Sequence, residues 1–124
     1  MFGLFKKKKF VSEEDYLDNK QNQIKMTDGT LDQLYKNGVK PSDKRPIDFF
    51  FFTNSKEKAE TLEKELQGKQ YAISPLQKVS GMFSISGSTE EMIVDTQTLK
   101  NWVANMCDLG YQFDCEFDGW GTTN

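Results

Sequence analysis

Four consecutive phenylalanines, Phe49–Phe52, constrain the fold of this 124-residue chain more than any other feature. The segment Ile47–Phe52 is too short for a stable helix and is rich in side chains that favour strands, so it predicts a strand. Successive side chains of a strand point to opposite faces of the sheet. Two of the four rings therefore belong to the core, and the other two lie on the second face. We expect N-terminal helices to cover that second face, and an open aromatic face that stacks RNA bases is the alternative.

Periodic apolar residues on both sides of this strand predict the rest of the fold. The expected helices cover 12–29, 30–37, 54–68 and 95–110, and the expected strands cover 71–79, 82–86 and 111–117. One or two N-terminal helices thus precede the order strand, helix, strand, strand, helix, strand. Right-handed crossovers fold that order into a ferredoxin-like split βαβ sandwich, an α+β fold whose antiparallel four-stranded sheet carries two helices on one face. In that topology the strands at 47–52 and 82–86 are central, and Pro75 suits an edge strand.

The chain is long enough for one domain with a core of its own. We place that domain at residues 12–124 and assign residues 1–11 to a flexible basic tail. Trp102 lies in the middle of the clearest amphipathic stripe and is therefore expected to be buried between a helix and the sheet. The stripe has the spacings i, i+3, i+4 and i+7 and consists of Leu99, Trp102, Val103 and Met106.

Charge is distributed unevenly along the chain. The formal net charge is −3, but Lys6–Lys9 give the first ten residues +4, so that residues 11–124 carry −7. Residues 101–124 contain no lysine or arginine. A surface of this kind disfavours nucleic-acid binding, and we expect no direct contact with nucleic acid. No apolar run approaches the roughly 20 residues that span a membrane.

The side chains of common catalytic and metal centres are missing. The sequence has no histidine, and its two cysteines, Cys107 and Cys115, do not have a zinc-binding spacing. No serine or cysteine has an evident activating base. We therefore expect no cofactor, no metal ion and no enzymatic activity. Two reduced thiols are typical of a cytoplasmic protein.

The predicted strand at 111–117 has a strongly acidic face. Alternation places on that face, together with the residue after the strand, the side chains of Gln112, Asp114, Glu116 and Asp118. A metal site and a paired-carboxylate hydrolase are two uses of such a face, but no acidic loop completes a metal shell and no deep pocket is indicated. A solvated edge that resists edge-to-edge pairing is the simplest interpretation, and a partner-binding face is the next.

The segments "DFFFFTNSKEKAETLEKEL" and "YAISP", the helix after Thr96 and the ending "EFDGWGT" together resemble the bacterial regulator of ribonuclease E activity B family. The resemblance covers roughly residues 24–122, and its most specific element is Asp118–Thr122. It implies a ferredoxin-like fold without catalytic activity. The best-known member binds ribonuclease E outside its catalytic half and alters RNA decay. That member continues as a long acidic tail where this sequence ends at Asn124, and the lysines at 6–9 are a second difference.

Trp120 lies between two glycines near the end of the sequence. The glycines let the chain turn after Asp118, so that the ring packs over the end of the core or stays exposed as the anchor of a binding surface.

Together with the resemblance, these features lead us to expect a regulator that binds a protein partner with a basic segment. The regulator is expected to be monomeric or weakly associating, and the resemblance implies ribonuclease E as the partner. The alternative is a ferredoxin-like module that binds RNA or a small ligand on an open aromatic face. The expected contact residues for the protein partner are Asp114, Glu116, Asp118 and Trp120.

Overall fold

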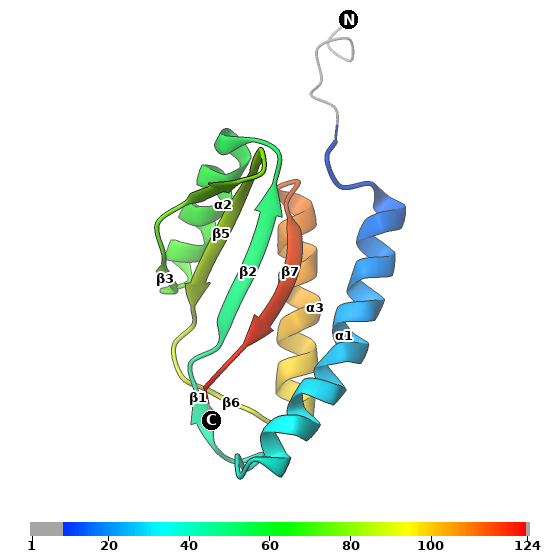
Figure 1. Ribbon diagram of the computed structural model, residues 1–124, viewed down its shortest axis with the longest axis vertical. Coiled ribbons are helices and arrows are strands. Elements are labelled where there is room, and N and C mark those ends of the chain that lie inside the picture. The colour runs from blue at the N-terminus through cyan, green and yellow to red at the C-terminus, as the bar shows by residue number, and fades with distance from the viewer. Residues whose placement is uncertain (1–8, 124) are drawn as a thin grey trace, which may run out of the picture.

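Three helices and seven strands make up the described part of the chain, residues 9–123 of a computed structural model, and confirm the α+β class (Figure 1). The helices are α1 (Glu13–Lys36), α2 (Lys56–Gly68) and α3 (Thr96–Gln112). The strands are β1 (Lys44–Arg45), β2 (Asp48–Thr53), β3 (Ala72–Ile73), β4 (Gln77–Val79), β5 (Met82–Ser88), β6 (Met92–Ile93) and β7 (Glu116–Gly121).

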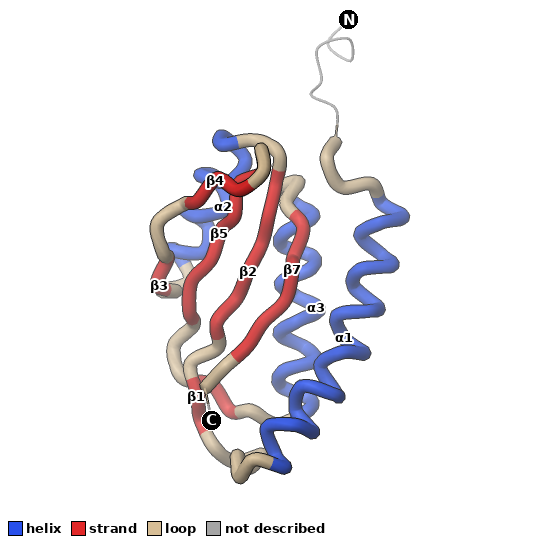
Figure 2. Tube along the Cα trace, in the orientation of Figure 1, coloured by secondary structure: helices blue, strands red, loops and turns tan. Residues whose placement is uncertain are grey.

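The main sheet is antiparallel and has the strand order β3-β5-β2-β7, so that β2 and β5 lie at its centre. β4 also pairs with β5, beyond β3 along the same edge (Figure 2). The strand predicted at 71–79 is split into β3 and β4 because Pro75, between them, has no N–H to donate to a ladder. β1 and β6 form a separate two-stranded sheet that the sequence did not indicate.

The N-terminal region, for which the sequence predicts one or two helices, forms the single helix α1. Ser12 caps it as expected, because its side chain accepts the N–H of Asp15 at 3.0 Å. The break expected at Gly29 is absent, since one buried stripe continues through both halves of the helix. The stripe consists of Gln23, Thr27, Leu31 and Leu34.

α2 and α3 lie on one face of the main sheet, whereas α1 packs on α3 beside the edge strand β7 (Figure 1). Trp102 is buried as predicted, at 8% exposure, and its ring meets that of Phe117 edge to face at 6.0 Å. The prediction that N-terminal helices cover the second sheet face is wrong, because α1 packs at the side of the sheet and Phe50 remains 42% exposed. The fully buried residues between sheet and helices include Phe49, Phe51, Leu62, Leu66, Ile85, Leu99, Val103 and Phe117.

The junction between α3 and β7 also differs from the prediction. The segment 111–117, expected as one strand, is divided between the end of α3, a turn and the start of β7. Gly110 does not end the helix. A Cβ there would lie 2.8 Å from the carbonyl oxygen of Cys115, so glycine permits close contact between helix and strand. The turn is made by Asp114, whose φ is 58°, and the N–H of Cys115 returns to the carbonyl of Gly110 at 2.8 Å.

Gly87, on β5, has no room for a side chain. A Cβ at this position would lie 2.2 Å from the backbone oxygen of Ala72 and 2.9 Å from the ring of Phe49. Gly87→Ala is therefore expected to lower the free energy of unfolding by about 1–3 kcal/mol. Chemical denaturation measures this, with Gly121→Ala as a matched strand control, since nothing lies within 4 Å of a Cβ at Gly121. Equal destabilisation by the two substitutions would contradict the close approach at Gly87.

Candidate functional site

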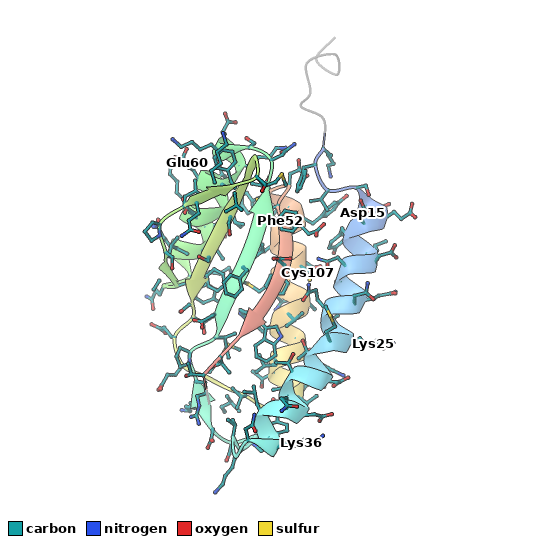
Figure 3. The ribbon with its side chains drawn as sticks, in the orientation of Figure 1. Asp15, Lys25, Lys36, Phe52, Glu60 and Cys107 are labelled. Carbon is teal, nitrogen blue, oxygen red and sulfur yellow. The ribbon has the colours of Figure 1, made fainter. Side chains whose placement is uncertain are left out.

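One face of the main sheet is not covered by α2 or α3. Alternation along β2 places Phe50 and Phe52 on this face, opposite to the two buried phenylalanines of the strand. The residues that pair with them on β5 are Ser86 and Ser84. These small side chains leave the ring of Phe50 exposed, whereas Phe52, labelled in Figure 3, is half-buried. We call this surface the open face, and it consists of Asp48, Phe50, Phe52, Ser84, Ser86, Ser88, Glu116 and Asp118.

Three carboxylates give the open face negative charge. Glu116 pairs with Phe52 in the register between β7 and β2, Asp118 is exposed on β7, and Asp48 begins β2. Within residues 9–123, no lysine or arginine nitrogen lies within 4.0 Å of these carboxylates. Burial raises the pKa of the Glu116 carboxyl, and the negative charges of Asp118 and Asp15 raise it further. The open face therefore combines uncompensated negative charge with an exposed aromatic ring.

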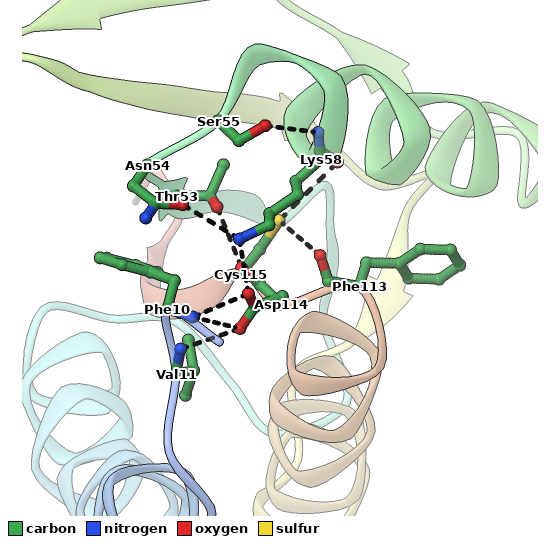
Figure 4. A network of polar contacts seen from close by, with 9 residues as sticks. All are labelled: Phe10, Val11, Thr53, Asn54, Ser55, Lys58, Phe113, Asp114 and Cys115. Carbon is green, nitrogen blue, oxygen red and sulfur yellow. Dashed lines mark hydrogen bonds and ion pairs between the residues drawn. The ribbon is translucent and has the colours of Figure 1, made fainter. Parts of the chain in front are cut away.

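Asp114 lies outside the open face, and other parts of the chain bind its carboxylate (Figure 4). It accepts the backbone N–H groups of Phe10 and Val11, each at 2.8 Å, and the Nζ of Lys58 at 2.6 Å. The side chains of Lys58 and Asp114 are only 15% and 16% exposed. Burial by itself raises the pKa of the Asp114 carboxyl, but the hydrogen bonds from Lys58 and from the two N–H groups, with the charge of Lys58, bring it below its ordinary value.

The residues bound by Asp114 belong to a short N-terminal strap, residues 9–11, which the sequence assigns to the flexible tail. The ring of Phe10 meets that of Phe52 edge to face, with 5.8 Å between the centroids. The Nζ of Lys9 donates to the hydroxyl of Tyr111 at 3.2 Å and lies 4.3 Å from the centre of its ring. The strap therefore ends at the border of the open face. The part of the predicted tail that precedes the strap lies outside the described residues.

α1 protects the free edge of β7. The side-chain amide of Asn19 donates to the carbonyl of Phe117 at 2.9 Å, a backbone group that an edge strand would leave unpaired. The ring of Tyr16 stacks on that of Tyr111 at 4.1 Å, which holds the start of α1 against the end of α3. A partner strand therefore cannot simply extend the sheet at this edge.

Trp120 lies within β7 and does not follow a turn. The sequence predicts a turn at Asp118–Gly119, but a β-bulge with Gly119 at φ 143° carries the strand on to Gly121. The ring is half-buried against the core. Its Nε1–H donates to the hydroxyl of Thr27 on α1 at 3.0 Å, so Trp120 joins the last strand to the first helix.

Trp120→Phe keeps most of the ring volume but removes this hydrogen bond. We expect the free energy of unfolding to fall by about 1 kcal/mol, because the buried hydroxyl of Thr27 loses its donor. A double-mutant cycle with Thr27→Val isolates the bond from the change in packing. A coupling energy near zero in that cycle would contradict the contact.

Other features expected from the sequence can be located in the structure. The row of three carboxylates on one strand does not form, because Asp114 lies in the turn, while Glu116 and Asp118 remain together on β7. The described residues contain no group of three or more metal-binding side chains placed to hold an ion.

Cys107 and Cys115 are free and buried, and burial raises the pKa of each thiol to about 12, so both are protonated and unreactive at neutral pH. Between residues 9 and 123, no helix combines the length and hydrophobicity that a membrane span requires.

These observations define a small α+β domain with an open, acidic and aromatic sheet face. The chain belongs to the Regulator of ribonuclease activity B family, whose family model matches residues 24–122. This match confirms the family resemblance noted in the sequence, and it includes every residue of the open face. The strap and the first half of α1 precede the matched residues. No curated protein sequence matches the chain.

Proposed function

We propose that this chain is a non-catalytic regulator of a ribonuclease E-type nuclease, and that its open face binds a basic segment of that enzyme. The family supports regulation of a ribonuclease. The observation that supports the site is the charge of Glu116 and Asp118, which no cation among residues 9–123 neutralises, beside the exposed ring of Phe50. An aromatic anchor with a charged rim is the composition of many protein interfaces.

A basic segment is complementary to this face in two respects. Its arginines and lysines are attracted by the carboxylates, which speeds association. An arginine can also stack its guanidinium group on the ring of Phe50. Nucleases hold RNA with such segments because phosphates attract cations. A regulator that occupies the segment competes with RNA without contacting the catalytic residues, and its own carboxylates repel RNA.

The four contact residues expected from the sequence take two different roles in this proposal. Glu116 and Asp118 contact the partner directly. Asp114 acts indirectly, because it holds the strap whose Phe10 borders the open face. Trp120 is also indirect, because its bond to α1 fixes the end of the strand that carries the two acids.

The proposal includes a ferredoxin-like fold and a cytoplasmic location. We infer a ferredoxin-like arrangement, because α2 and α3 alternate with the strands of the main sheet and β2 and β5 lie at its centre. The two free, buried thiols support a cytoplasmic location. We expect a monomer or a weak oligomer that acts through its partner.

Inhibition of RNA cleavage tests this function. A purified ribonuclease E-type nuclease from the same organism would cleave a fluorescent RNA oligonucleotide in the presence of increasing amounts of the chain. We expect inhibition, and we expect Glu116→Gln/Asp118→Asn to be about tenfold less potent, since two charges of the interface are lost.

The matched control is Glu60→Gln/Glu65→Gln, which removes the same charge from two exposed positions on α2. Equal potency of the two double variants would contradict the proposed site. Direct binding of the RNA by the chain, lost in Phe50→Ser, would favour the alternative function as an RNA-binding module.

A further inference from the structure

The chain contains, immediately before Phe10, a segment with the composition that the open face is proposed to bind. Residues 1–9 read "MFGLFKKKK" and combine Phe2, Leu4 and Phe5 with four lysines and no acid. We propose that this segment occupies the open face when no partner is bound, so that the chain competes with its own partner. The inference rests on the proposed function for one point only, that the open face is the partner site.

The strap places the segment within reach of the face. The contact between Phe10 and Phe52 fixes the end of the segment at the border of the open face. Phe50 lies two residues from Phe52 on the same side of β2, about 7 Å away at the usual rise of a strand. Eight extended residues span up to about 26–29 Å, so the segment can cross the whole face.

The charges on the two sides are complementary. Lys9 is held by Tyr111, so the lysines that we propose to meet the open face are Lys6–Lys8. Glu116 and Asp118 have no cationic partner among residues 9–123, and their mutual repulsion is relieved when lysines approach. The apolar side chains that precede the lysines are suited to cover the ring of Phe50.

Tethering makes this contact effective even if it is weak. Because Asp114 and Tyr111 hold the strap, the segment is presented to the face at an effective concentration on the order of millimolar. A partner must displace it, so the apparent affinity for the partner falls by the fraction of molecules whose face is occupied. The open face would thus bind only those partners whose affinity is high enough to displace the chain's own N-terminal segment.

Carbodiimide cross-linking of the full chain tests the occupancy without any partner. The reagent joins lysine amines to carboxylates in direct contact, and mass spectrometry identifies the joined residues. We expect links from Lys6, Lys7 or Lys8 to Glu116 or Asp118. Phe50→Ser leaves all of these reactive groups in place but removes the apolar anchor, and it should lower the yield of the links about fivefold. Ile93→Ser, which changes another exposed apolar residue on β6, should leave the yield unchanged.

The outcomes distinguish the occupants of the face. Mixing isotopically heavy and light chains separates links within a molecule, which support the proposal, from links between copies, which would overturn it. Absence of links to the two acids, or yields that do not respond to Phe50→Ser, would also overturn it. If the links form in the free chain and are lost when anionic phospholipid vesicles are added, the self-contact is supported and a lipid surface displaces it.

A second measurement separates this inference from the proposed function. In the RNA-cleavage assay, Lys6→Glu/Lys7→Glu/Lys8→Glu should inhibit the nuclease several-fold more potently than the wild type, because its face is free. Links without any inhibition by wild type or variant would support the self-contact and refute the proposed function. If no links form and the triple variant inhibits as strongly as the wild type, the self-contact is refuted and the proposed function is supported.

Discussion

Trp102→Ala is expected to lower the free energy of unfolding by about 3–5 kcal/mol, because it removes a large side chain from the core. The indole is 8% exposed, and its Nε1–H donates to the hydroxyl of Tyr71 at 3.2 Å. The ring also packs edge to face on Phe117 at 6.0 Å. Truncation leaves a cavity between α3 and the sheet, and the hydroxyl of Tyr71 loses a donor.

Urea denaturation followed by far-UV circular dichroism measures this change. Asn105→Ala is the matched control, because Asn105 is an exposed residue of the same helix and its replacement should change the stability by less than about 1 kcal/mol. An unfolding midpoint that Trp102→Ala does not shift would contradict the packing of α3 on the sheet.

Asp114→Ala is expected to lower the free energy of unfolding by about 2–4 kcal/mol, because it breaks a largely buried ion pair and leaves Lys58 without its carboxylate. The backbone N–H groups of Phe10 and Val11 lose their acceptor as well. The control is Asp28→Ala. Asp28 pairs with Lys100 at 2.9 Å but is 51% exposed, so its removal should cost less than about 1 kcal/mol.

The effect of Asp114 should depend on pH. Its pKa is lower in the folded chain than the ordinary value of 3.8, so the ionised carboxylate stabilises the fold above that pH. This contribution is lost as the pH falls through the folded-state pKa. The difference in stability between wild type and Asp114→Asn should therefore be constant near neutral pH and shrink below about pH 4. A difference that grows with acidification would contradict the network around Asp114.

The elements with strong local signals were predicted correctly. Ser12 accepts an N–H of the first turn of α1, as its position before three acids suggests. The stripe around Trp102 correctly predicted which side of α3 is buried, and the run of phenylalanines correctly predicted the strand β2. In each case neighbouring residues carry the whole signal, because capping and periodicity act within one or two turns.

The segment 111–117 was predicted wrongly because its alternating pattern competes with a tertiary contact. Tyr111 stays in α3, where its ring stacks on Tyr16 of α1, a residue distant in the sequence. Gly110 was expected to stop the helix, but it serves close packing against Cys115. Aspartate tolerates the left-handed conformation better than most residues, and this was the available signal for a turn at Asp114.

Half of the candidate site could be predicted and half could not. Glu116 and Asp118 were expected together on the last strand, since alternation alone places them there. The open face around Phe50 was only the alternative expectation, because whether α1 covers the sheet or packs on α3 depends on contacts between distant segments. The network of Asp114 was missed for the same reason, as Phe10 and Asp114 are 104 residues apart and no local pattern links them.

Binding kinetics of the chain on the immobilised nuclease test the proposed face most directly. Wild type and Glu116→Gln/Asp118→Asn would be compared by surface plasmon resonance at low and high salt, with Asp114 left intact because it holds the strap. At low salt, we predict that the double variant associates about tenfold more slowly, because charges of this kind mainly set the association rate. At high salt the difference should nearly vanish, since a Debye length of about 3 Å at 1 M screens exposed charges. Equal association rates for the two proteins at both salt concentrations would show that Glu116 and Asp118 are only a solvated part of the sheet and that the open face does not bind the partner.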